Sequence, residues 1–319
     1  MTDVRIVLDT DPGVDDAFAI FYLAAQPDVE LVAVGSVHGN VPAPVAADNA
    51  LRLLDLVGLT EVPVAVGARE PLVQPLHTAE FVHGPDGLGG HAGPLSSRRP
   101  VAESAAEQLV RLARAHPAEL TVVALGPLTN IALATMLEPT LPRLVKSLTV
   151  MGGAVTVPGN ITPYADANTW HDPEATDIVL RAGFDLTLVG LDVTETARAD
   201  FAWLNRLAAL DSDRARYAHA IVAHYADLYA TLLGEKVFTL HDPLAAALTV
   251  DPALATHREL VLAVELTGTH TRGQIVADLR VLARETNIES SIGQARRAAK
   301  VVESVQSGPF LERLLAALA

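Results

Sequence analysis

Four aspartates lie within eight residues near the start of the chain: Asp9, Asp11, Asp15 and Asp16. The run Ile6-Val7-Leu8 before them is typical of a strand, and residues 17–25 after them have the apolar spacing of a helix. Pro12-Gly13 predicts a sharp turn between the two elements. We therefore expect the acids at the carboxyl end of a strand and over the start of a helix, where open α/β sheets bind ligands.

So many carboxylates at one turn indicate a bound cation. Like charges this close repel one another and raise one another's pKa, and a cation among them relieves the repulsion. Ligands that are all oxygens select a hard ion, Ca²⁺ or Mg²⁺. A helix N-terminus stabilises one or two such charges, but hardly four. The alternative is an acidic surface turn that caps a helix, and the charge crowding favours the metal site.

Length and composition limit the class of protein. The 319 residues are 50% hydrophobic, enough for one large core or for two. No linker-like segment interrupts the chain, so we predict a single domain over residues 1–319. A net charge of −15 argues against a nucleic-acid or membrane-surface partner, and the lack of cysteine excludes disulfides and thiolate metal sites. Without a signal peptide or a long apolar run, a cytoplasmic location is expected unless a leader has been trimmed.

Strand-like and helix-like segments alternate along most of the chain. Runs typical of buried strands fall at residues 30–37, 62–66, 120–125, 148–151 and 185–191. Helical spacing falls between them, at residues 44–56, 103–115, 131–137 and 173–182. The alternation predicts an α/β fold with an open, mostly parallel sheet flanked by helices. Residues 261–266 and 275–278 are predicted as later strands, and residues 310–318 as a closing helix.

Polar side chains follow several of these strands. Asn40 comes after the second strand, and Met151 ends another that runs into Gly152-Gly153, where a ligand can approach the backbone closely. A plain tight turn explains these glycines equally well. The loop of residues 159–172 groups two amides and a carboxylate, which suit a ligand rich in hydroxyls, although turns also favour these residue types. Its polar residues are Asn160, Asp166 and Asn168.

Other candidates lie in a glycine-rich loop and on later helices. Residues 72–100 are too rich in glycine for a regular element, and this long loop presents His83, which alone is more often a solvated bystander. Tyr225 and Tyr229 share one face of the helix predicted at residues 213–233, as core or as a ligand wall. His241-Asp242 precedes a helix, where the pair can serve as acid and metal ligand or Asp242 can simply cap the helix.

Other acid-rich and phosphate-binding templates do not fit. The calcium helix-loop-helix template needs Glu at its twelfth position, where counting from Asp9 gives Ile20. Neither a phosphate-binding Gly-Lys-Ser/Thr loop nor a G-x-S-x-G elbow is found. Asp-x-Asp after a strand also suggests phosphatases that form an aspartyl-phosphate, but none of the three lysines precedes an acidic pair at a strand end. That interpretation is kept as a weak alternative.

The motif DTDPGVDDA at residues 9–17 resembles the signature of the inosine-uridine-preferring nucleoside hydrolases. The likeness extends to about residue 278 and includes Val37-His38-Gly39-Asn40, Gly126-Pro127-Leu128-Thr129-Asn130, Gly159-Asn160, Asp172-Pro173-Glu174 and His241-Asp242-Pro243. The resemblance implies a Rossmann-like nucleoside hydrolase fold, Ca²⁺ as cofactor, a homodimer or homotetramer, and a role in nucleoside salvage.

The same resemblance implies roles for individual residues. Asp11, Asp16, Asp242 and the main-chain carbonyl of Leu125 would hold Ca²⁺. Asp15 and Asn40 would hold the ribose 2′- and 3′-hydroxyls, and Asn160, Asp166 and Asn168 the rest of the sugar. His241 and His83 would lie beside the base, which favours a base-nonspecific preference. Two departures, Asp166 in place of the usual Glu and Ala167 in place of a frequent aromatic, leave the substrate preference open.

The implied reaction is hydrolysis of the N-glycosidic bond of a ribonucleoside to ribose and free base. Asp11 would act as general base on a calcium-bound water, carboxylates around the ribose would stabilise the positive charge that develops at C1′, and His241 would protonate the departing base. The alternative is a non-catalytic, calcium-dependent ribonucleoside-binding protein. The complete set of three metal-binding aspartates favours the enzyme.

Overall fold

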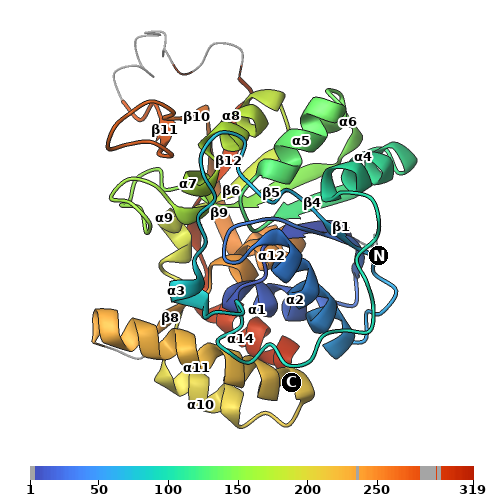
Figure 1. Ribbon diagram of the computed structural model, residues 1–319. Helices are drawn as coiled ribbons and strands as arrows, with labels where there is room; N and C mark the ends of the chain where they lie inside the picture. The colour runs from blue at the N-terminus through green and yellow to red at the C-terminus, as the bar shows by residue number, and fades with distance from the viewer. Residues whose placement is uncertain (1–3, 235–236, 281–291, 293–295) are drawn as a thin grey trace.

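The computed structural model describes residues 4–234, 237–280, 292 and 296–319, and it confirms the predicted α/β fold (Figure 1). Eight strands form the main sheet in the order β3-β2-β1-β4-β5-β6-β12-β9. Within the described part of this sheet, only the pair β9 and β12 is antiparallel. The bounds are β1 Val4–Thr10, β2 Val29–Ser36, β3 Val64–Val66, β4 Leu120–Ala124, β5 Ser147–Met151, β6 Leu186–Val189, β9 Ala255–Leu260 and β12 Ala299–Val305.

The strand order reverses beside β1. From β1 the chain adds β2 and β3 on one side, then crosses to the other side and adds β4, β5 and β6. The crevice outside the carboxyl ends of β1 and β4 is therefore a topological switch point, the usual ligand site of an open α/β sheet. Asp11 directly follows β1, and Leu125 directly follows β4.

Helices cover both faces of the sheet, and each face has its own apolar core (Figure 1). Alternate side chains of β1 point to opposite faces, so Leu8 belongs to one core and Val7 to the other. The first core takes in α1 Val14–Ala24, α2 Ala43–Leu56, α10 Phe201–Ala208, α11 Asp213–Leu233, α12 His241–Val250 and α14 Ser307–Leu318. The second takes in α4 Ala105–Ala115, α5 Thr129–Leu137, α6 Leu141–Leu144 and α8 Pro173–Ala182.

Several short elements complete the described chain. They are the helices α3 Glu80–His83, α7 Ala167–His171, α9 Leu191–Thr194 and η1 Pro252–Leu254, and the strand pairs β7 Arg198–Ala199 with β8 Phe238–Thr239 and β10 Leu262–Val264 with β11 Ile275–Ala277. Two of them, α3 and α7, lie inside segments that the sequence predicted as loops. Within the described ranges, no helix is both long and apolar enough to cross a membrane.

The C-terminal part of the sheet differs from the prediction. Residues 261–266 and 275–278 do form strands, β10 and β11, but these make a separate antiparallel hairpin. The strands that extend the main sheet are β12 and β9, which the sequence analysis missed. The residues of β9 are half-buried or exposed until Leu260, as expected for an edge strand, so β9 lacks the continuous apolar run of a central strand.

Candidate active site

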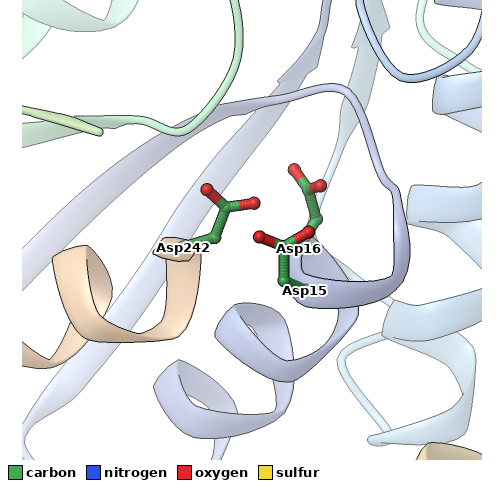
Figure 2. A group of neighbouring side chains, drawn as sticks. All are labelled: Asp15, Asp16 and Asp242. Atoms are coloured by element: carbon green, nitrogen blue, oxygen red, sulfur yellow. The ribbon is translucent and has the colours of Figure 1, made fainter. Parts of the chain in front are cut away.

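A buried carboxylate cluster lies at the switch point. Asp11 follows β1, Asp15 and Asp16 occupy the first turn of α1, and Asp242 occupies the first turn of α12. All four side chains are buried. One carboxylate oxygen from each of Asp15, Asp16 and Asp242 lies within 4.8 Å of the other two. Figure 2 shows Asp242 and Asp15 pointing toward one another from the two helices.

Asp16 is the aspartate that is best supplied with hydrogen-bond donors. Its carboxylate accepts from the Thr10 hydroxyl, from Gly13 N at 2.9 Å and from Asn40 Nδ2 at 3.1 Å. The bond from Gly13 N caps α1, so the helix starts at Val14 and not at Ala17 as predicted. The capping alternative is thus correct for Asp16, but the turn is buried and does not lie on the surface.

Asp11 lies between two glycines and retains one free oxygen. Its Oδ2 accepts from Asn40 N at 2.7 Å, whereas its Oδ1 is buried and has no hydrogen-bond partner among the described residues. A Cβ atom on Gly39 would collide with Oδ2, and one on Gly126 would lie 2.6 Å from Oδ1. The missing side chains of these two glycines therefore make the space that the carboxylate occupies.

Burial and mutual repulsion raise the pKa of most of these acids. Burial, and then the charge of Asp16, raises the pKa of Asp15 to about 8. The same two causes raise the pKa of Asp11, and burial with the charge of Asp15 raises that of Asp242. Buried carboxylates that repel one another, one of them with an unpaired oxygen, fit a hard divalent cation, which would supply the missing positive charge.

The cluster opens into a cavity of about 320 Å³. Its lining includes every residue that the sequence analysis predicted for substrate binding: Asp15, Asn40, His83, Met151, Asn160, Asp166, Asn168, Tyr225 and Tyr229. His241, Asp242 and Leu125 line it as well. The apolar part of the wall includes Phe81, Val82, Ile161 and Leu228, which the sequence analysis did not select because nothing distinguishes them from core residues.

Two histidines reach the cavity as neutral rings. Burial lowers the pKa of His83 to about 3 and that of His241 to about 4. His83 Nδ1 accepts a hydrogen bond from Val14 N at 3.1 Å, which leaves the proton on Nε2, and the ring stacks on Tyr225 at 5.5 Å. The Tyr225 ring in turn meets Tyr229 edge-on at 5.0 Å.

His241 is held by a residue that the sequence analysis missed. Its Nδ1 lies 2.8 Å from the hydroxyl oxygen of Thr194, which is fully buried on α9. No motif marks Thr194, since its partner lies far along the chain. The structure also excludes Asp242 as a helix cap, because the N-cap of α12 is Leu240 and makes no side-chain bond. The Asp242 carboxylate instead faces the other acids.

The predicted sugar-binding residues also bond to the backbone. Asp166 Oδ1 accepts from Thr169 N at 3.0 Å and so caps α7. Asn160 Oδ1 accepts from Ala167 N at 2.9 Å. Asn168 Nδ2 donates to the carbonyl oxygens of Leu125 at 2.6 Å and of Met151 at 3.1 Å, which leaves its own oxygen free. Turn chemistry and a place on the cavity wall therefore coexist in these residues.

A carboxylate cluster beside a cavity at the switch point of a parallel sheet defines an α/β protein that can bind a small molecule together with a cation. The family model described as inosine-uridine preferring nucleoside hydrolase matches residues 6–312. The chain belongs to this family.

Individual relatives agree with this assignment. The inosine-uridine preferring nucleoside hydrolase of Crithidia fasciculata is 38% identical over 278 residues, 86% of this chain and 88% of the relative. Uridine nucleosidase 1 of Arabidopsis thaliana is 37% identical over 265 residues, 83% of this chain and 79% of the relative. Among solved structures, the plant nucleoside hydrolase PpNRh1 superposes with a TM-score of 0.94 at 34% identity, covering 99% of this chain and 98% of its own.

Proposed function

We propose that this protein hydrolyses the N-glycosidic bond of ribonucleosides to ribose and free base. The observation that carries the proposal is the buried aspartate cluster at the end of a cavity of about 320 Å³, in a member of the nucleoside hydrolase family. The cavity combines a wall of carboxylates and amides, suited to the hydroxyls of a sugar, with an aromatic and apolar wall suited to a base.

The proposed cofactor is Ca²⁺, held by Asp11, Asp16, Asp242 and the main-chain carbonyl of Leu125. Support comes from the donor set, which is all oxygen, and from the unpartnered Oδ1 of Asp11. The Asp15 carboxylate lies among these acids, so it would contact both the cation and the ribose. When bound, the cation would polarise an attacking water and lower its pKa.

The remaining steps belong to Asp11 and to side chains on the cavity wall. Asp11, with its free oxygen, is the proposed general base toward the water that attacks C1′. Asp15 and Asn40 would hold the 2′- and 3′-hydroxyls, and Asn160, Asp166, Asn168 and the Met151 backbone the rest of the ribose. Fixed carboxylate and amide oxygens stabilise the positive charge that develops on the sugar.

His241 is the proposed general acid for the departing base; because burial keeps its ring neutral in the free protein, it would take up a proton from solvent before it protonates the base. It lines the cavity with His83, Tyr225 and Tyr229, which would enclose the base. We propose that the site accepts both purine and pyrimidine nucleosides, as the names of the Crithidia and Arabidopsis relatives together suggest. The family resemblance also supports a cytoplasmic homodimer or homotetramer that acts in nucleoside salvage; sedimentation of the purified protein measures the oligomeric state.

No observation favours the two alternative functions. A pure ribonucleoside-binding protein needs no general base beside its sugar site. An aspartyl-phosphate phosphatase needs a lysine near its acids, and no lysine of the described chain lines the cavity. An assay of uridine, inosine and a phosphate monoester, each with and without EDTA, separates the three functions: the hydrolase releases reducing sugar from the nucleosides, the phosphatase releases phosphate from the ester, and the binder releases neither.

Replacement of Asp11 by alanine tests the proposed reaction. Because Asp11 is the proposed base, Asp11→Ala should lower kcat for uridine by about 10³-fold. Asp192→Asn is the control: this carboxylate follows another strand, β6, and bonds to Val155 N and Thr156 N, away from the cavity. It should keep near wild-type activity. Circular dichroism verifies that both variants fold, and full turnover by folded Asp11→Ala would remove Asp11 from the reaction.

A further inference from the structure

The motif Gly126-Pro127-Leu128-Thr129-Asn130 contains two polar residues to which the proposed reaction gives no role. Thr129 and Asn130 are completely or almost completely buried in the first turn of α5. Neither lines the cavity. Both nevertheless form hydrogen bonds with segments that carry site residues, and these hydrogen bonds indicate a structural role for the two side chains.

Thr129 links a histidine to an aspartate through its hydroxyl. Its Oγ1 donates to Asp172 Oδ2 at 2.7 Å, because a carboxylate can only accept. The oxygen of the same hydroxyl lies 3.0 Å from His38 Nε2 and must accept from it. The ring therefore carries its proton on Nε2, and burial keeps it neutral by lowering the pKa of His38 to about 4. The three side chains form a directed relay, His38 to Thr129 to Asp172.

Each end of this relay lies next to a segment that lines the cavity. His38 stands two residues before Asn40, whose backbone N–H binds Asp11 and whose side chain binds Asp16. Asp172 directly follows α7, the helix that carries Asn168. The relay thus ties the loop that holds two carboxylates to the end of the helix that carries Asn168.

Asn130 also helps to hold the loop that contains His38 and Asn40. Its Nδ2 donates to Asp9 Oδ2 and to Ser36 O, both at 2.8 Å, and its Oδ1 accepts from Ala68 N at 2.8 Å. Ala68 O in turn accepts from His38 N. The loop that contains His38 and Asn40 is therefore held to β1, to the end of β2 and to α5 at once.

We propose that the relay of His38, Thr129 and Asp172 positions Asn40, and through it Asp11 and Asp16, for cation binding and for catalysis. These are positioning residues, since none of them reaches the cavity. The catalytic part of the inference rests on the proposed hydrolysis of nucleosides, whereas the cation part rests only on the proposed Ca²⁺ site.

The test removes the Thr129 hydroxyl while keeping the shape of the side chain. In Thr129→Val the link between His38 and Asp172 is lost, so Ca²⁺ affinity, measured by titration calorimetry on chelator-treated protein, should fall about tenfold, and kcat/KM for uridine by a similar factor. Thr129→Ser restores the hydroxyl and should recover most of both losses. The matched control is Thr135→Val on the same helix, whose hydroxyl bonds only to Ile131 O; both quantities should stay within about twofold.

Three results would overturn the proposal: unchanged Ca²⁺ affinity and activity in Thr129→Val, an equal loss in Thr129→Ser, or an equal loss in Thr135→Val. If Thr129→Val does not fold, His38→Phe removes the donor that begins the relay. Ca²⁺ affinity and kcat/KM are then measured for that variant in its place. The proposed function fails separately, when wild-type protein releases no sugar from nucleosides. In that event the Ca²⁺ titrations still decide whether the relay positions the carboxylates.

Discussion

One residue type, aspartate, takes several roles in this site, and local hydrogen bonding separates them. Asp16 accepts hydrogen bonds from three donors, which fix its position. Asp11 has only the Asn40 backbone donor and a second, free oxygen. Asp166 bonds to the N-terminus of α7. The same side chain is thus a helix cap, a proposed base and a wall of the sugar site, according to which donors surround it.

At the residue scale, His241 is tested by changing the leaving group. His241→Ala should lower kcat/KM for uridine and inosine by about 10²-fold, because these bases need a proton as they depart. A p-nitrophenyl riboside leaves as a stable anion, so its hydrolysis should change only a few-fold. Steady-state kinetics on both substrates give the comparison. Equal losses on the two would mean that His241 shapes the cavity and does not protonate the base.

The element that brings the site together is the loop after β2. It contains Gly39, whose missing side chain leaves room for the Asp11 carboxylate, and Asn40, which donates hydrogen bonds to Asp11 and Asp16. The loop has no regular structure, and its shape comes from its contacts with neighbouring elements. Small changes in its backbone should therefore affect cation binding before they affect the fold.

Gly39→Ala tests this element. Its Cβ would collide with Asp11 Oδ2, so the carboxylate must move and Ca²⁺ affinity should fall at least about tenfold. Gly58→Ala is the control: Gly58 has a φ of +77° but open space around its Cβ position. It should cost about 1 kcal/mol of unfolding free energy and leave Ca²⁺ affinity unchanged. Calorimetric titration and thermal unfolding measure both, and normal affinity in Gly39→Ala would contradict the expected crowding.

For the whole molecule, the acid cluster should couple stability to pH and to calcium. The pKa values of Asp11, Asp15 and Asp242 are raised in the folded protein, that of Asp15 to about 8. The folded state then binds more protons than the unfolded state above the ordinary aspartate pKa of about 4, so these groups lower the stability of the cation-free protein as pH rises toward about 8.

Calcium should reverse this loss, because it replaces the protons that the carboxylates release. At about 1,000 times its Kd, the ion should add about 4 kcal/mol to the unfolding free energy. The rise in Tm on adding Ca²⁺ should be larger at about pH 8 than at about pH 5.5, where protons compete with it. Thermal unfolding of chelator-treated and calcium-loaded protein measures the difference in Tm. In Asp16→Asn, calcium should no longer raise the Tm. A Tm gain independent of pH would exclude the cluster as the binding site.

Much of the architecture follows from local patterns. Alternating strand and helix periodicity determines the α/β class, and the crowded aspartates after the first strand mark the edge of the sheet where the ligand site lies. The candidates chosen for substrate binding, such as Asn40 at a strand end and Asn168 in a polar loop, all line one cavity. These features are readable because each depends on neighbours within a few residues of the chain.

The tertiary structure decided the rest. Asp242 reaches Asp15 and Asp16 only because α12 packs against α1, and Thr194 meets His241 only through the fold. The insertion of β12 between β6 and β9 likewise leaves no local pattern. The physical reason is the same in each case: these contacts join residues far apart in the chain, and their energy depends on strand order and helix packing, which short-range periodicity does not encode.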